Sequence, residues 1–236
     1  QIKLDLLKNN FISNVSHEMR TPISTVKVAI EAILKYDMDL EKERAKEYLQ
    51  MAWLEMDRLE NFSNKILNAY IIQTGKFEMQ FEEISINEII DEVILSQKIH
   101  IEKRNATVTF IKKNDFIQAT ADKLHLQGVL INLIDNAIKF SKEKALIEIT
   151  SEVKNYEVHI SVKDNGPGIP ENYKDKSFDR FFRVPEGNQH NSKGFGLGLF
   201  YASEIVKLHQ GKITYDSNIN GGSIFKIVFP KEIINP

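Results

Sequence analysis

The chain contains no cysteine among its 236 residues. Disulfide bonds and thiolate chemistry are therefore excluded, and a reducing compartment, the cytoplasm, is the expected location. No apolar run approaches the roughly 20 residues that a membrane-spanning helix needs, and the N-terminal segment lacks the basic-then-apolar order of a signal peptide. We expect a segment that does not itself span a membrane. Because it begins with Gln inside a helix-like pattern, we expect it to be part of a longer protein.

An excess of positive charge is also missing. The 31 Lys and Arg residues are balanced by 33 Asp and Glu residues, so the net charge is -2 and nucleic acid is not an expected partner. With 42% hydrophobic residues the chain can bury sizeable cores, and its length favours two modest domains.

The N-terminal third has the pattern of a helical hairpin. Apolar residues recur at spacings of three and four over residues 4–34 and again over residues 45–69, and a short polar connector, residues 36–39, separates the two runs. Such a hairpin has no third element to cover its apolar stripes, so a second copy is expected to complete a four-helix bundle. The pattern ends at Thr74, which predicts a homodimerising domain over residues 1–73 and a second domain over residues 74–236.

The second domain has mixed periodicity. Helices are predicted at residues 87–103, 123–140 and 198–209, and strands at residues 77–81, 107–112, 146–153, 157–163, 212–216 and 223–229. Residues 166–194 show no sustained period and read as a long loop of the kind that is usually functional. The predicted fold class is α+β, a helical hairpin followed by a two-layer α/β sandwich.

His17, in the string SHEMRTP, is predicted to face away from the buried stripe of the first helix. Glu18 can accept a hydrogen bond from one ring nitrogen, so that the other nitrogen presents its lone pair as a nucleophile. Thr21 lies on the same helix face, and Pro22 is expected to bend the helix beside the histidine. Taken alone, a histidine such as His17 is more often an ordinary surface residue, and its neighbours favour the functional interpretation.

The string DNGPGIP directly follows a predicted strand. Gly166 and Gly168 allow the backbone to approach a ligand closely, and the carboxylate of Asp164 can accept a hydrogen bond from an exocyclic amine. Without further context the same string is also typical of a plain turn.

Alternating glycines in GFGLGL lead into a predicted helix, whose free N–H groups favour an anion. The chain has no Walker loop, and GFGLGL lacks the spacing of the dinucleotide fingerprint. Glycines at this place are equally compatible with close packing of a helix on a strand.

Asn132 and Asn136 in NLIDNAIKF lie four residues apart on one helix face among apolar neighbours. Amide oxygens suit Mg²⁺, and Lys139 adds positive charge nearby. The alternative is that the asparagines brace a neighbouring loop.

The order of these motifs resembles the sensor histidine kinases of two-component signalling. HEMRTP is similar to their phospho-acceptor box, and NLIDNA, DNGPGIP, FDRFF and GFGLGL are similar to motifs of their ATP-binding domain, over residues 11–230. The resemblance implies a dimeric helical hairpin joined to the Bergerat-type sandwich of gyrase-like ATPases. It further implies ATP and Mg²⁺ as cofactors, a response regulator receiver domain as partner, and a cytoplasmic location within a membrane-anchored sensor.

The resemblance also implies roles for single residues. His17 is the phosphorylated residue, Glu18 its general base or orienting partner, Thr21 the residue that positions water for phosphatase activity, and Arg183 a contact to the γ-phosphate. Asn136 binds Mg²⁺. The implied nucleotide contacts are Asn132, Lys139, Phe140 against the adenine, Asp164 at the adenine amino group, and the pocket and lid glycines Gly166, Gly168, Gly194, Gly196 and Gly198.

Two positions depart from the family pattern. Phe195 stands where the family often has Thr or Ser, and Gly128 interrupts a predicted helix where the family often has Gln, at a cost of about 1 kcal/mol relative to Ala. The remaining histidines lack acidic neighbours arranged like those of His17 and are interpreted as structural or surface residues: His100, His125, His159, His190 and His209. Two other functions stay open, a nucleotide-binding dimeric interaction module without kinase activity and a chaperone-type or topoisomerase-type ATPase.

Overall fold

The computed structural model describes residues 2–35, 42–73, 77–141, 144–184, 196–218 and 221–233. The described residues form two compact units, one up to residue 73 and one from residue 77 onward. Within the described ranges, no helix combines the length and the apolar composition that crossing a bilayer requires.

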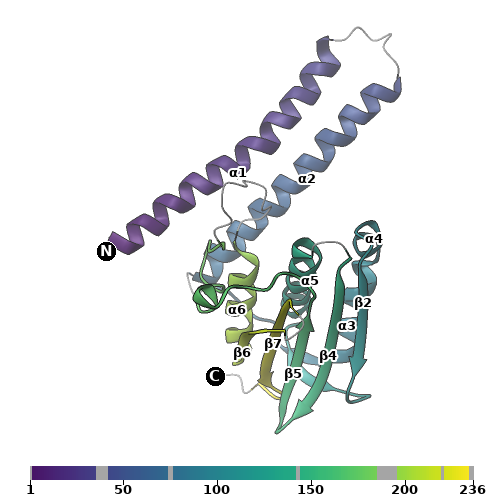
Figure 1. The fold of residues 1–236 in the computed structure, drawn as a ribbon, viewed down its shortest axis with the longest axis vertical. Coiled ribbons are helices and arrows are strands. Elements are labelled where there is room, and N and C mark those ends of the chain that lie inside the picture. Colours follow the sequence, from purple (N-terminus) through teal and green to yellow (C-terminus); the bar gives the residue numbers. More distant parts are fainter. Residues whose placement is uncertain are drawn as a thin grey trace. The chain divides into compact units, whose positions relative to one another are not determined.

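The first unit is a pair of long helices, α1 (Ile2–Lys35) and α2 (Lys42–Gln73), which lie side by side as the predicted hairpin (Figure 1). The predicted connector at residues 36–39 lies outside the described residues. Pro22 and Ala29 of α1 and Phe62 of α2 are buried, so the apolar stripes do meet.

Each helix also keeps a second apolar stripe exposed. Its members recur at spacings of seven, four and eleven residues, which keeps them on one side of a helix. These exposed residues are Ile23, Ile30 and Leu34 on α1, and Leu49, Met56 and Leu67 on α2.

The second unit is built on a five-stranded sheet with the order β2-β4-β5-β7-β6. Its strands are β2 (Thr107–Lys112), β4 (Leu146–Lys154), β5 (Glu157–Lys163), β6 (Lys212–Ser217) and β7 (Ser223–Pro230). The β2–β4 pair is parallel, and all other pairs are antiparallel. Helices α3 (Ile86–Ser96), α5 (Lys123–Phe140) and α6 (Gly198–Leu208) cover one face, which makes the two-layer sandwich that the sequence predicts (Figure 1).

The core lies between this helical layer and the sheet. Alternate side chains of the central strands are buried, for example Ile147 and Ile149 of β4 and Ile160 of β5, and Leu133 and Ile134 of α5 are buried with them. Each such side chain contributes roughly 1.5–3 kcal/mol when it leaves water, so the alternating pattern sets which face of each strand turns inward.

The predicted strand at residues 77–81 is wrong. These residues have no strand partner, and the strand begins only at β1 (Glu82–Ser85), which pairs with the equally short β3 (Gln118–Ala121). Phe77 and Phe81 instead pack on imidazole rings, with ring centroids 4.6 Å from that of His125 and 5.5 Å from that of His209, respectively. The alternating apolar residues of this segment therefore reflect the packing of its aromatic rings and not a β-strand.

The helix predicted at residues 87–103 is two helices. α3 ends at Ser96, and α4 (Lys98–Lys103) begins after Gln97. The Ser96 hydroxyl donates a 2.8 Å hydrogen bond to the Val93 carbonyl, a local bond of the kind that bends or ends a helix.

Candidate functional site

Asp164 follows β5 and is buried, with a 7% exposed fraction. Its Oδ1 atom accepts hydrogen bonds from the backbone N–H groups of Gly166 (2.8 Å) and Ser223 (3.0 Å), and its own N–H donates to the Ser223 carbonyl (2.9 Å). Among the described residues nothing donates to the other carboxylate oxygen, Oδ2. The site therefore holds a carboxylate with one oxygen fixed by the protein and one oxygen left for a ligand donor.

The loop after Asp164 depends on its glycines. A Cβ atom on Gly166 would lie 3.0 Å from Asp164 Oδ1 and 3.4 Å from the Phe140 carbonyl oxygen, and Gly168 has a φ of +76°, a conformation that L side chains rarely adopt. Asn165 ties the loop to the start of β4, because its amide accepts from Leu146 N–H (2.9 Å) and donates to the Lys144 carbonyl (2.9 Å). This loop and the end of α5 thus adjoin.

α5 brings two half-buried amides to the same region. Asn132 and Asn136 make no side-chain hydrogen bond to any residue that the structure describes, although each amide has donors and acceptors to satisfy. At the end of the helix the Lys139 ammonium lies over the Phe140 ring, 4.5 Å from its centroid, and the ring is 43% exposed. An aromatic face, a cation and two amides with no partner among the described residues therefore line the C-terminal half of α5.

The start of α6 lies against α5. A Cβ atom on Gly198 would lie 3.3 Å from Asn132 Oδ1, so the first turn of α6 lies against that amide. The N-cap residue Leu197 makes no side-chain cap hydrogen bond, so within the described part of the chain the first N–H groups of α6 can serve an anion.

Gly196 connects this glycine segment to the FDRFF motif. Its carbonyl accepts a 2.9 Å hydrogen bond from the Phe181 N–H, its φ is +65°, and a Cβ atom would lie 2.7 Å from the Phe182 carbonyl oxygen. Arg183 follows in a half-buried position on the same segment. Gly194 and Phe195 lie outside the described residues.

Sequence reasoning missed Arg180, whose guanidinium carbon lies 4.9 Å from the centroid of the Phe200 ring on α6. Burial lowers the pKa of Arg180, and the charge of Glu204 raises it again. The FDRFF motif thus packs on α6 through a cation–π contact as well as through Gly196. The motif itself was the available signal, but the sequence analysis singled out only Arg183, the residue that follows it.

The predicted acceptor residues lie on α1. The backbones of His17 and Glu18 belong to that helix, and their side chains lie outside what the structure describes. Thr21, four residues from His17, is exposed, and its carbonyl accepts a 3.1 Å hydrogen bond from the Thr25 hydroxyl.

The other histidines have closer acidic neighbours than their sequence context indicates. Asp135 Oδ1 on α5 lies 3.3 Å from His100 Nδ1 on α4, a contact between residues far apart in the sequence. Glu157 Oε2 lies 3.6 Å from His159 Nε2, because the two residues alternate along β5 and so share one face of the strand. His209 is structural, since it is 1% exposed and binds backbone groups through both ring nitrogens. His190 lies outside the described residues.

Gly128 has a structural reason that the sequence does not show. A Cβ atom there would lie 3.0 Å from the Tyr201 hydroxyl oxygen, which lies 3.0 Å from His125 Nδ1. Burial, with a smaller effect of Asp122, raises the pKa of Tyr201 to about 12, so the hydroxyl keeps its proton. The glycine makes room for this contact between α5 and α6.

Family models match both units of the chain. The family described as histidine kinase-, DNA gyrase B- and HSP90-like ATPase matches residues 121–233, and the His Kinase A (phospho-acceptor) domain matches residues 7–75.

Named relatives agree with both matches. Sensor protein RprX of Bacteroides fragilis is 33% identical over 98% of this chain and 45% of its own length, and signal transduction histidine-protein kinase ArlS of Staphylococcus haemolyticus is 32% identical over 94% of this chain and 48% of its own length. The chain thus spans about half the length of these relatives.

Solved structures show the same similarity. The catalytic domain of histidine kinase ThkA is 37% identical with a TM-score of 0.59, and the match covers 66% of this chain and 100% of that domain. The structure of ThkA in complex with response regulator protein TrrA is 32% identical with a TM-score of 0.72, over 97% of this chain and 63% of that chain. The chain belongs to the sensor histidine kinases of two-component systems, which are protein histidine kinases that use ATP.

Proposed function

We propose that the chain transfers the γ-phosphoryl group of ATP to His17 and then to an aspartate of a response regulator. The observation that carries this proposal is the Asp164 carboxylate, which is buried and fixed through Oδ1 while Oδ2 faces no donor among the described residues. This carboxylate oxygen can accept a further hydrogen bond, and the adenine amino group supplies a donor.

The residues around Asp164 fit the rest of a nucleotide. The exposed Phe140 ring offers a face to the adenine, and the glycines Gly166 and Gly168 keep the pocket free of side chains. Asn136, with Asn132 beside it, has the oxygen donor that Mg²⁺ takes together with phosphate oxygens and water. When bound, the metal ion neutralises negative charge on the phosphates.

Positive charge and backbone donors are available for the phosphate end. Lys139 follows the two asparagines on α5, Arg183 follows the FDRFF motif, and the first N–H groups of α6 carry no side-chain cap. The glycine segment Gly194, Gly196 and Gly198 is proposed to close over the phosphates, since glycines allow close backbone approach.

The chemical step needs little from the protein beyond position and charge. A lone pair of the His17 imidazole forms a bond to the γ-phosphorus while the bond to the bridging oxygen breaks, and ADP leaves with that electron pair. Glu18 accepts a hydrogen bond from the other ring nitrogen and so stabilises the positive charge that develops on the ring. Thr21 is proposed to position a water molecule when the phosphorylated regulator is hydrolysed.

His17 and the nucleotide-binding residues belong to different compact units, here proposed as a phosphotransfer domain over residues 1–73 and a catalytic domain over residues 74–236. Transfer therefore requires that the two units approach each other. The complex of ThkA with a response regulator supports a receiver domain as the partner of this chain also.

A homodimer is proposed through the exposed stripes of α1 and α2. Six large apolar side chains on regularly spaced positions are more than isolated surface residues, and a second hairpin would cover them in a four-helix bundle.

Incubation of the protein with γ-labelled ATP and Mg²⁺ tests the proposal. We expect label that is stable to base and lost in acid, as phosphohistidine requires. His17→Gln should remove the label and keep nucleotide binding, whereas Asp164→Asn should lower nucleotide affinity at least about tenfold, since it removes a charged acceptor. Labelling retained in His17→Gln would show that His17 is not the phosphorylated residue. Release of free phosphate without labelled protein would instead indicate an ATPase of the chaperone type.

A further inference from the structure

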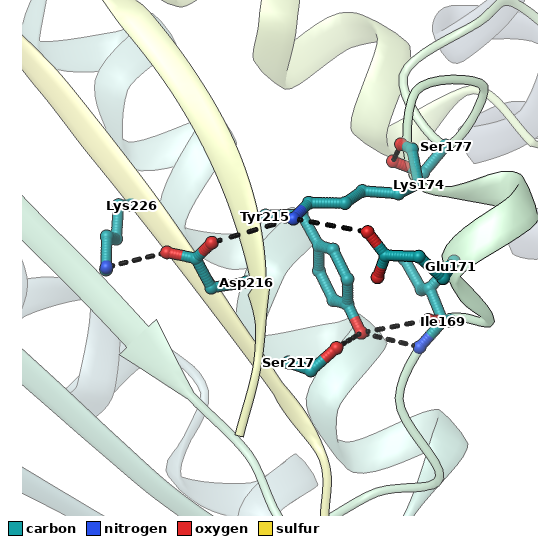
Figure 2. A network of polar contacts seen from close by, with 8 residues as sticks. All are labelled: Ile169, Glu171, Lys174, Ser177, Tyr215, Asp216, Ser217 and Lys226. Carbon is teal, nitrogen blue, oxygen red and sulfur yellow. Dashed lines mark hydrogen bonds and ion pairs between the residues drawn. The ribbon is translucent and has the colours of Figure 1, made fainter. Parts of the chain in front are cut away.

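Tyr215 lies on β6 and is buried, with a 3% exposed fraction. Its hydroxyl oxygen accepts a 2.7 Å hydrogen bond from the Ile169 N–H and donates to the Ile169 carbonyl at 3.2 Å (Figure 2). The ring packs on Phe225 of β7, with centroids 5.5 Å apart. A single side chain thus forms hydrogen bonds with both backbone groups of Ile169, in the loop of residues 164–170 that contains Gly166 and Gly168.

The two ends of this loop are held by different strands. Asp164 is tied to β7 through Ser223, and Ile169 is tied to β6 through Tyr215. Between them, a Cβ atom on Gly168 would lie 3.3 Å from the Tyr215 hydroxyl and 3.1 Å from the Gly222 carbonyl oxygen. The Gly168 backbone thus lies close to both the Tyr215 hydroxyl and the Gly222 backbone, with little room for a side chain.

Ion pairs surround this contact (Figure 2). Lys174 Nζ lies 3.8 Å from Glu171 Oε1 and 3.8 Å from Asp216 Oδ1, and Lys226 donates to Asp216 Oδ2 at 2.7 Å. The hydrogen bond from Lys226 lowers the pKa of Asp216. These side chains are 35–80% exposed, so each pair contributes between zero and about 1 kcal/mol. The Tyr215 hydroxyl is therefore the main contact that holds Ile169, at the end of the loop away from Asp164.

We infer that Tyr215 is a positioning residue for nucleotide binding, because its hydroxyl sets the conformation of the loop from Gly166 to Pro170 beside the free oxygen of Asp164. The inference rests on the proposed function and adds to it a residue that touches neither the nucleotide nor the reacting atoms.

Removal of the Tyr215 hydroxyl should weaken nucleotide binding. Without it the Ile169 N–H loses its acceptor in a part-buried place, and the Ile169 carbonyl loses a donor. A loss of this kind corresponds to about a tenfold weaker nucleotide affinity. Asp164 keeps its own bonds to β7, so the rate at saturating nucleotide should stay unchanged.

Calorimetric titration of ADP with Mg²⁺ into the full chain tests the inference on Tyr215→Phe, which keeps the ring and removes only the hydroxyl. The matched control is Ser151→Ala, which removes another buried hydroxyl, the donor to Asn87 Oδ1 at 2.7 Å. Ser151 lies five residues along β4 from Leu146, about 17 Å at ~3.4 Å per residue. We expect Tyr215→Phe to raise the ADP dissociation constant and the KM for ATP about tenfold with kcat unchanged, and Ser151→Ala to change neither.

A second measurement needs no variant. The Ile169 amide should exchange slowly with deuterated water in the wild-type protein without nucleotide, since the bond to Tyr215 exists already. Fast exchange of that amide, or equal ADP affinity of wild type and Tyr215→Phe, would overturn the inference and leave the proposed function standing. Absence of ADP binding by the wild-type protein would overturn the proposed function and the inference with it.

Discussion

His209 is a neutral histidine fixed by its two bonds. Its Nε2 atom accepts a hydrogen bond from the Asp122 N–H (3.0 Å), so the proton is on Nδ1, which donates to the Ile205 carbonyl (2.8 Å). Asp122 in turn caps α5 through His125 N–H (3.0 Å) and accepts from Gln80 N–H (2.7 Å). One imidazole therefore connects α6 to the start of α5 and to the segment before β1.

We predict that protonation of His209 destabilises the second unit. Burial lowers the pKa of His209, against smaller raising effects of the Ile205 carbonyl and Asp122. The unfolded chain then binds more protons than the folded chain below the ordinary histidine pKa of about 6.5, so this contribution is present above that pH and is lost as the pH falls below it.

Urea unfolding at pH 7.5 and pH 5.5 measures the effect. The free energy of unfolding of wild type should fall more between these pH values than that of His209→Gln, whose side chain does not titrate there. An equal loss in both proteins would show that other groups carry the pH dependence.

On α5, the position of Gly128 next to Tyr201 changes the expected effect of a Gly→Ala substitution on stability. Gly→Ala inside a helix usually stabilises by about 1 kcal/mol. At Gly128 the new methyl group would lie 3.0 Å from the Tyr201 hydroxyl, so we expect that hydroxyl to shift and to lose its 3.0 Å contact with His125. This loss, also about 1 kcal/mol, should cancel the helix gain.

A double-mutant cycle checks this prediction. Gly128→Ala should leave the free energy of unfolding unchanged or lower in wild type, and should raise it by about 1 kcal/mol in the Tyr201→Phe background. Without the hydroxyl the nearest ring atoms lie at 3.4 and 3.6 Å, which is ordinary contact. A gain of the same size in both backgrounds would contradict the role assigned to Gly128.

The same elements show how far sequence reasoning reaches. The bounds of α5 and β2 could be predicted to the residue, because the apolar periodicity of each starts and stops at polar or turn residues. β1 and β3 have only four residues each, too few for a period to appear, and their pairing joins residues 82 and 121. The break between α3 and α4 is accompanied by a hydrogen bond from the Ser96 hydroxyl to the Val93 carbonyl, which the apolar pattern does not record.

For the site, the sequence predicts which residues gather but not what holds them. Asp164, Gly166 and Phe140 were predicted from motifs, and the structure brings them together. Tyr215 was missed, because it lies in a strand whose alternation marks it only as a core residue, and its partner is a backbone far along the chain.

For the chain as a whole, the exposed apolar stripes of α1 and α2 predict how the chain forms a homodimer. Ile30→Lys places a charge within the proposed interface, where its desolvation is costly, so the dimer dissociation constant should rise by at least about tenfold. Val28→Lys is the matched control, because Val28 is also an exposed apolar residue of α1 but lies about 200° around the helix from Ile30. Sedimentation equilibrium measures both, and equal masses for the two variants would argue against this interface.

The pairing of β5 with β7 also bears on the order of folding. The register joins Lys163 to Ile224, so the whole stretch that holds the glycine loops and α6 is a closed excursion between two neighbouring strands. Closing such an excursion costs entropy that only the completed strand pair repays. During refolding the ability to bind nucleotide should therefore return with this late pairing and not with the earlier local hairpins β4–β5 and β6–β7.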